Sequence, residues 1–103
     1  MEYIKKFTTE LPTMAMTTAY GNDLYRKENV QMETQIEISP VHKSGGCFET
    51  FDTETGGEDF YAEGVLEIEK VNGKLSLTGY DGVFELPEYI VEEVRKAGIE
   101  IDL

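Results

Sequence analysis

Four carboxylates crowd a short segment near the middle of the chain. They are Asp52, Glu54, Glu58 and Asp59, with Gly56 and Gly57 between them. Carboxylate oxygens gathered on a flexible loop are the ligands that hard divalent cations prefer, so these four residues are candidate metal ligands. The same composition is typical of a hairpin tip with hydrated polar flanks, and we expect this second explanation to hold.

The segment also has part of the spacing of an EF-hand loop counted from Asp52. Acids stand at the first and third positions, Gly57 at the sixth and Glu63 at the twelfth. The fifth position is Gly56 rather than Asp or Asn, and the flanking residues alternate as in strands, whereas an EF-hand needs helices. We therefore expect no EF-hand, and any metal would be held by the four loop carboxylates.

A third interpretation of this segment comes from a family resemblance. Residues 51–57, Phe-Asp-Thr-Glu-Thr-Gly-Gly, resemble the first signature of the DnaQ-like (DEDD) exonucleases, an Asp-x-Glu at the end of a strand followed by Thr and Gly. In that family the two acids hold metal ions that activate a water, which implies Asp52 and Glu54 as ligands. The family's further acidic motifs are not matched, because His42 precedes Asp52 and Tyr80-Asp81 has the wrong spacing. A metal-dependent nucleic-acid enzyme is the alternative function.

The charge balance favours a basic partner. The chain of 103 residues carries 21 acidic and 9 basic residues, for a formal net charge of −12. Such a surface repels nucleic acid and anionic membranes, so we expect direct contact with neither. There is one cysteine, Cys47, no secretory h-region and no membrane-spanning apolar run, so we expect a cytoplasmic protein.

The acids are concentrated in one stretch. Between Ser44 and Glu69 there are eight acids and no base. Glu63, Glu67 and Glu69 share one face of a predicted strand, where carboxylates spaced about 7 Å apart approach the spacing of successive phosphates. A run of charge is most often a hydrated surface. The functional alternative is a protein–protein interaction module, or a DNA-mimic inhibitor, that binds a basic protein through these glutamates together with Glu58 and Asp59.

The chain is organised around a predicted hairpin. Alternating runs at 60–71 and 74–80 are joined by Asn72-Gly73, the strongest short signal for a two-residue turn. The turn predicts a register that pairs Val71 with Lys74, Ile68 with Leu77, Leu66 with Gly79 and Val65 with Tyr80. Leu66, Ile68, Leu75 and Leu77 then form a dry face, and the glutamates between them form a wet one.

The remaining elements follow from the same patterns. Strands are predicted at 3–10, 13–20, 30–38, 47–53 and 99–103, with Pro12 interrupting the first two and a helix competing for 13–20. A helical turn or loop is predicted at 23–29, and a helix at 87–97, where Pro87 opens it and Gly98 closes it.

Together these elements predict an α+β fold in one domain, residues 1–103. We expect an antiparallel sheet of about five to seven strands, with the C-terminal helix packed on one face and the acids on the other. An open edge on strand 30–38 would let the protein pair with a second copy. The expected protein is non-enzymatic and needs no cofactor, and an accessory protein of a phage or mobile element has this size and charge.

Overall fold

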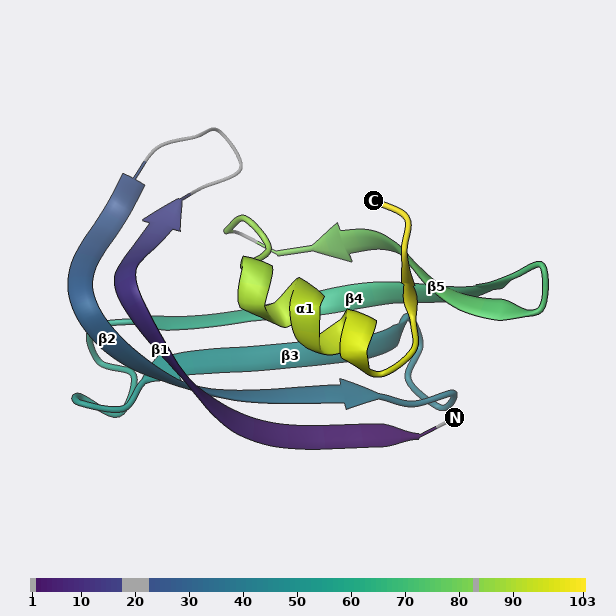
Figure 1. Cartoon of the computed structure of the whole chain (residues 1–103), viewed down its shortest axis with the longest axis horizontal. Coiled ribbons are helices and arrows are strands. Elements are labelled where there is room, and N and C mark those ends of the chain that lie inside the picture. Colours follow the sequence, from purple (N-terminus) through teal and green to yellow (C-terminus); the bar gives the residue numbers. More distant parts are fainter. Residues whose placement is uncertain (1, 18–22, 83) are drawn as a thin grey trace.

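The computed structural model describes residues 2–17, 23–82 and 84–103. In these ranges the chain forms strands β1 (Tyr3–Thr17), β2 (Asp23–Ile38), β3 (Gly45–Asp52), β4 (Tyr61–Val71), β5 (Lys74–Asp81) and β6 (Glu100–Ile101), and helix α1 (Glu88–Lys96). The strands form one sheet in the order β1-β2-β3-β4-β5-β6, antiparallel except for β5 and β6. The predicted α+β fold with a C-terminal helix on an antiparallel sheet is confirmed (Figure 1).

The β4–β5 hairpin forms around the predicted turn. Asn72 and Gly73 both have positive φ, 52° and 81°, as a two-residue hairpin turn requires. Val71 pairs with Lys74 and Ile68 with Leu77, as predicted. Beyond these pairs the predicted register is wrong, because it shifts by one between Glu67 and Ile68 and leaves Thr78 as an additional residue in β5. Leu66 therefore faces Tyr80, and Val65 faces Asp81.

Strands β1 and β2 are longer than predicted. Pro12 does not separate two strands, because β1 runs continuously from Tyr3 to Thr17 along the edge of the sheet, where a proline is tolerated. The loop or helical turn predicted at 23–29 is instead the start of β2. Residues 18–20, which we assigned to a strand, lie outside the described residues.

A change in side-chain alternation explains how these strands bend. Asn29, near Pro12 in the β1–β2 pairing, has a φ of +54°. Leu11 and Met14 both pack into the same core although they lie on opposite sides of a regular strand. Figure 1 shows the resulting bend, after which the last described part of β1 runs on the helix side of the sheet.

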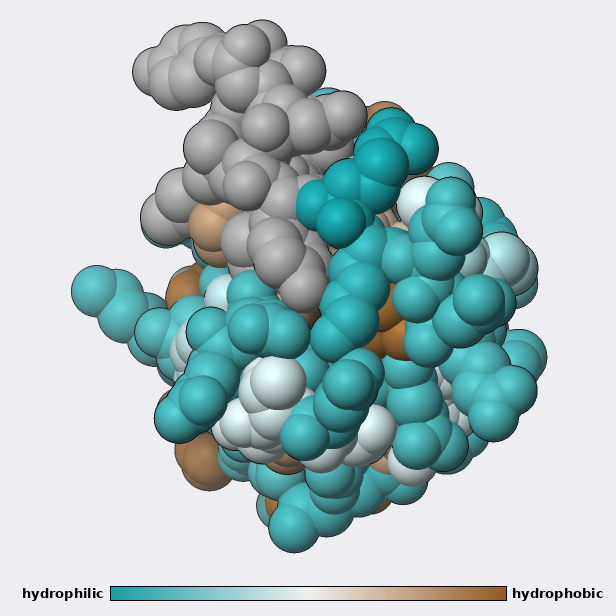
Figure 2. Space-filling model, turned by 90° about the vertical axis from the view of Figure 1, so that its left-hand side faces the viewer, coloured by the Kyte–Doolittle hydropathy of each residue, from teal (hydrophilic) through white to brown (hydrophobic). Residues whose placement is uncertain are grey.

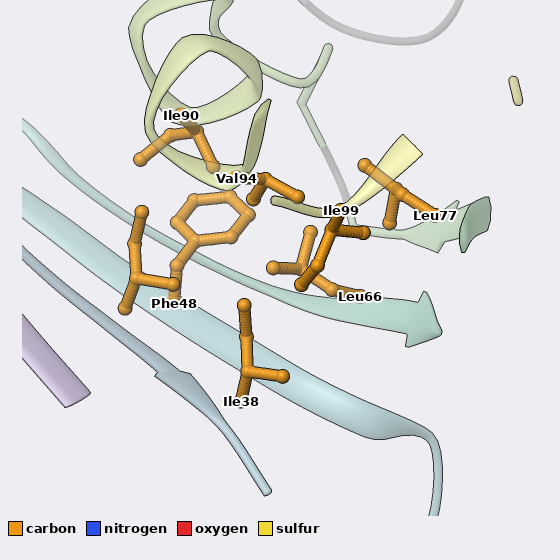
Figure 3. Packing of buried hydrophobic residues seen from close by; sticks show 8 residues of the cluster. Ile38, Phe48, Leu66, Leu77, Ile90, Val94 and Ile99 are labelled. Atoms are coloured by element: carbon orange, nitrogen blue, oxygen red, sulfur yellow. The ribbon is translucent and has the colours of Figure 1, made fainter. Parts of the chain in front are cut away.

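The helix covers the main core. Ile90 and Val94 of α1 pack with Ile99 against inward residues of the central strands, which are Ile36, Ile38, Phe48, Leu66 and Leu77 (Figure 3). Each of these side chains is at most 3% exposed. Ile68 and Leu75 are partly buried against this cluster, so the predicted dry face of the hairpin is confirmed.

A second core lies under the bent hairpin. Met14, Val30, Met32, Phe60 and Ala62 are buried together, and Leu11, Phe84 and Tyr89 pack against them. Between the two cores runs a buried chain of hydroxyls, in which Thr50 is 2.8 Å from Thr34 and 2.9 Å from Tyr89. Tyr89 packs against both cores, so the helix joins them.

Candidate functional site

The side of the sheet away from α1 carries the acids. Alternation along β2, β3 and β4 turns their apolar residues towards the helix and leaves the residues between them on the open side. We call this surface the acidic face and define it by Glu33, Glu37, Glu49, Glu63, Glu67, Glu69 and Asp81. Five of these side chains are exposed, and Glu37 and Glu49 are half-buried. Neither β3 nor β4 carries a base before Lys70.

The centre of the acidic face places two carboxylates directly opposite each other. Glu49 of β3 pairs with Glu63 of β4 in the register of the sheet. The hydroxyl of Tyr61 donates to both, at 3.0 Å from Glu49 Oε2 and 3.2 Å from Glu63 Oε2. Hydrogen bonding to Glu49 first, and then burial and the remaining charge, raise the pKa of Tyr61 to about 12. The phenol therefore stays protonated and bridges two like charges.

A shallow hollow of about 510 Å³ lies beside this pair. Cys47 and Val65 face each other across β3 and β4, and Glu37 and Asp81 lie at the two ends of the same row. Burial, followed by the charges of Glu37, Glu49 and Glu63, raises the pKa of Cys47, so its thiol is kept neutral. The hollow thus combines an apolar floor with an anionic rim.

Three of the predicted binding residues share this surface. Glu63, Glu67 and Glu69 are exposed on the open side of β4, and Thr78 donates to Glu69 at 3.2 Å. The other two, Glu58 and Asp59, lie in the exposed loop after β3 instead. Figure 2 views the end of the molecule formed by the bent hairpin, where the described surface is mainly hydrophilic.

The predicted metal ligand Asp52 has a structural task. Its side chain is fully buried at the end of β3. One carboxylate oxygen accepts hydrogen bonds from the Thr55 amide and hydroxyl, at 2.9 and 2.6 Å, and the other accepts from the Phe60 amide at 3.0 Å. Burial opposes ionisation, but these hydrogen bonds and the nearby charge of Lys27 outweigh it and lower the pKa of Asp52. Asp52 therefore closes the loop as a buried anion.

Two of the other three loop acids contact a lysine. Lys27 Nζ lies 2.9 Å from Glu54 Oε2 and 3.3 Å from Asp59 Oδ2, so the ammonium group of this side chain lies between the two carboxylates. Glu58 is exposed, with its amide bonded to the Thr55 carbonyl. Within the described residues no group of three or more His, Cys, Asp or Glu side chains is arranged to hold a metal. The four predicted ligands are thus not brought to one point.

Two other features of the predicted enzyme and dimer can be located. After Gly57 the chain enters the β4–β5 hairpin. The resemblance to the DnaQ-like exonucleases would instead require a helix there, because that fold interleaves helices with its sheet. Residues 30–38 lie in β2, which has β1 and β3 on either side. The predicted open edge on that strand is therefore wrong, because β1 and β6 are the strands at the two edges of the described sheet.

The described part of the chain has no helix that is both long and apolar enough to cross a membrane.

Sequence reasoning missed a buried acid on the helix. Glu93 is 8% exposed and accepts from Lys5 of β1 at 2.8 Å and from Lys96 at 3.5 Å. The hydrogen bond from Lys5 is the main reason that the pKa of Glu93 is lowered. The available signal was its position between Ile90 and Val94 on the apolar stripe, which marks Glu93 as inward-facing.

Sequence reasoning also missed the role of Tyr61. Its place next to a glutamate pair follows only from the β3–β4 register, which no turn signal fixes.

Comparisons with protein-family models, with curated proteins and with solved structures found no match.

Proposed function

We propose that this protein is a non-enzymatic interaction module that binds a basic protein through the acidic face. The observation that carries the proposal is the opposed Glu49–Glu63 pair held by Tyr61. Like charges directly across two strands destabilise a sheet by about 0.2–1 kcal/mol relative to a neutral pair. A surface that keeps such a pair beside further acids supports a role in recognition rather than in folding.

The hollow beside the pair fits the side chain of a basic residue. Lysine and arginine carry an apolar stem and a charged head. The stem would lie over Cys47 and Val65, and the head would reach Glu37, Glu49 or Asp81 at the rim. An arginine guanidinium offers several donors in one plane, so it is matched best to neighbouring carboxylates. The proposed partner is therefore a protein with an arginine-rich surface, such as one that otherwise binds the phosphates of nucleic acid.

The test compares two variants of equal net charge. We expect an arginine-rich peptide to bind the wild type at low salt, with affinity falling as salt rises. The triple variant E37Q/E49Q/E63Q removes three acids from the acidic face and should weaken binding about threefold to a hundredfold, since each rim charge contributes about 0.2–1 kcal/mol.

The control variant is E85Q/E88Q/E92Q, which removes three exposed glutamates from the helix side of the molecule. It has the same charge as the first variant and should bind almost as the wild type does. Equal losses in both variants would show that the peptide responds only to net charge, and the acidic face would then have no specific role. Isothermal titration calorimetry measures both affinities.

The metal-dependent alternative is not proposed further. It requires Asp52 and Glu54 to share a cation, and the structure gives these two carboxylates separate partners: loop amides and a hydroxyl for Asp52, and Lys27 for Glu54.

A further inference from the structure

A second hollow lies on the helix side of the sheet, where the bent β1–β2 hairpin meets the start of α1. Its volume is about 310 Å³. The lining is largely apolar and includes Met14 of β1, Phe48 of β3, Phe60 and Ala62 around the start of β4, and Phe84 and Tyr89 around the start of the helix. It shares only Phe48 with the lining of the hollow beside Glu49 and Glu63, and none of the residues that define the acidic face lines it.

Hydrogen bonds fix the aromatic walls of this hollow. The Tyr80 hydroxyl donates to the Phe84 carbonyl at 2.6 Å, which holds the segment before the helix against β5. The Tyr89 hydroxyl is 2.9 Å from that of Thr50, which in turn bonds Thr34. Burial raises the pKa of both tyrosines, so their hydroxyls remain protonated. The walls are therefore positioned before any ligand arrives, as in most small-molecule sites.

Size and lining together define the apolar part of a ligand. A dry cavity of about 150 Å³ lined by similar side chains accommodates benzene. A hollow of about twice that volume takes one aromatic ring together with a short chain. Aromatic walls favour an aromatic ring, because ring pairs gain energy beyond the area that they bury.

Charge defines the remaining part of the ligand. Two exposed carboxylates, Glu85 and Glu88, line the hollow, and none of its described lining residues is basic. An anionic ligand would be repelled there, and an ammonium group would be attracted. We propose that this hollow binds a small aromatic amine, with the ring between Phe60, Phe84 and Tyr89 and the ammonium group at Glu85 and Glu88.

The test uses phenylethylammonium as the probe and phenylacetate as its anionic counterpart of similar shape. We expect phenylethylammonium to bind saturably and to raise the melting temperature by about 4 °C or more when it is well above its dissociation constant. Phenylacetate should bind at least about tenfold more weakly. Absence of phenylethylammonium binding at millimolar concentration, or equal binding of phenylacetate, would overturn the proposal.

Two variants of equal charge locate the site. E85Q/E88Q should weaken phenylethylammonium binding about threefold to tenfold, as expected for two exposed charge pairs. E49Q/E63Q, on the acidic face, should leave it unchanged. If E49Q/E63Q weakens amine binding as much as E85Q/E88Q does, the site is wrongly placed. Since arginine-rich peptide binding depends on the acidic face alone, either proposal can fail without the other.

A filled hollow gives an independent check. Ala62→Leu adds three carbons to the wall and should abolish amine binding. Because an enlarged core residue can strain the fold, the wild type provides a second measurement: nuclear Overhauser contacts should join the ring protons of the amine to Phe60 and Tyr89. Contacts elsewhere would overturn the assignment, as would a dimer that Ala62→Leu disrupts, since a second copy would then occupy the hollow.

Discussion

The two sides of one sheet treat carboxylates in opposite ways. On the helix side, Asp52 and Glu93 are buried, and each has specific donors that hold it as an anion. On the open side, Glu49 and Glu63 face each other and share one phenol. The helix side therefore uses charge to fix the chain, whereas the open side holds two like charges on one shared donor, which is the feature that the proposed binding of a basic protein would use.

The comparison shows how an alternating strand separates core residues from exposed acids and, under the proposed function, stability from recognition. Phe48 and Glu49 are neighbours in β3, yet one fills the main core and the other lies on the acidic face. Changes on one side should therefore alter the free energy of unfolding, and changes on the other should alter binding.

The largest effect is expected in the main core. Phe48 stacks on Tyr80 with ring centroids 6.0 Å apart and lies against Gly64, where an added Cβ would be 2.8 Å from the Phe48 ring. Phe48→Ala should lower the free energy of unfolding by about 3–5 kcal/mol. Phe51→Ala, the same change on the open side of β3, should lower it by about 1 kcal/mol or less. Similar losses in urea unfolding would refute the division between the sides.

The next effect concerns Asp52. Asp52→Asn removes the charge from a buried group that accepts three hydrogen bonds, and should lower stability by about 2 kcal/mol. Because the folded-state pKa of Asp52 is lowered, its contribution is present above its usual pKa of about 4 and disappears as the pH falls through the folded value.

Urea unfolding measured between neutral and acid pH provides the check on Asp52. The variant should lose less stability than the wild type on acidification. Glu54→Gln, on the same loop, should change stability by about 0.5 kcal/mol or less, because its ion pair with Lys27 is exposed. Parallel acid profiles for the wild type and Asp52→Asn would contradict the assigned role of Asp52.

A smaller effect is expected at Glu93. Glu93→Gln keeps the shape of the side chain but weakens its bonds to Lys5 and Lys96, and should lower stability by about 1–2 kcal/mol. Its lowered pKa has the same sign as that of Asp52, so this contribution too is lost in acid. Glu92→Gln on the exposed side of α1 is the control and should have little effect. A double-mutant cycle with Lys5→Met isolates the Lys5–Glu93 coupling.

Tyr61 tests the open side. Tyr61→Phe should lower stability by about 0.5–1 kcal/mol, because both glutamates lose a donor. Of the six tyrosines, Tyr61 should titrate near pH 12. Its contribution is complete below the usual tyrosine pKa of about 10 and is lost as the pH rises towards 12. Because the pKa values of Tyr80 and Tyr89 are raised too, ultraviolet titration of tyrosinate should show one late-titrating tyrosine fewer in the variant than in the wild type.

The smallest effect has the opposite sign. Glu49→Gln removes a like-charge contact and should raise stability by about 0.2–0.5 kcal/mol at low salt. Added salt should reduce the difference, since it screens the repulsion. Precise urea midpoints at two ionic strengths are sufficient to measure it. A clear loss of stability would show that Glu49 serves the fold, and the division between the two sides would then be wrong at its centre.

Local patterns predicted the elements whose signals are local. The period of two in 30–38, the Asn72-Gly73 turn and the helix predicted at 87–97, observed at Glu88–Lys96, all appear in the structure. The dry side of the hairpin followed from alternation alone. Two predictions were wrong: the helical turn or loop at 23–29, and the interruption between two strands at Pro12. Pairing between β1 and β2 outweighs the weak local preferences of these residues.

The acids show where local reasoning ends. The sequence indicates which glutamates of β4 are exposed, because strand parity decides it. It does not show that Asp52 is a buried loop anchor, since Thr55, Phe60 and Lys27 reach it only in the folded chain. The Glu49–Glu63 pair depends in the same way on the β3–β4 register, in which Phe48 lies opposite Gly64 and in close contact with it.

Thr78 is the additional residue of a β-bulge in β5, and it changes which side of the sheet the residues after it face. It decides that Tyr80, and not Gly79, points towards the helix for the last part of β5. Deleting Thr78 would restore regular alternation and leave Tyr80 opposite Leu66, with its side chain still on the helix side. The hydrogen bond from Tyr80 to the Phe84 carbonyl would then be kept, so loss of this residue should straighten β5 without remodelling the segment before α1.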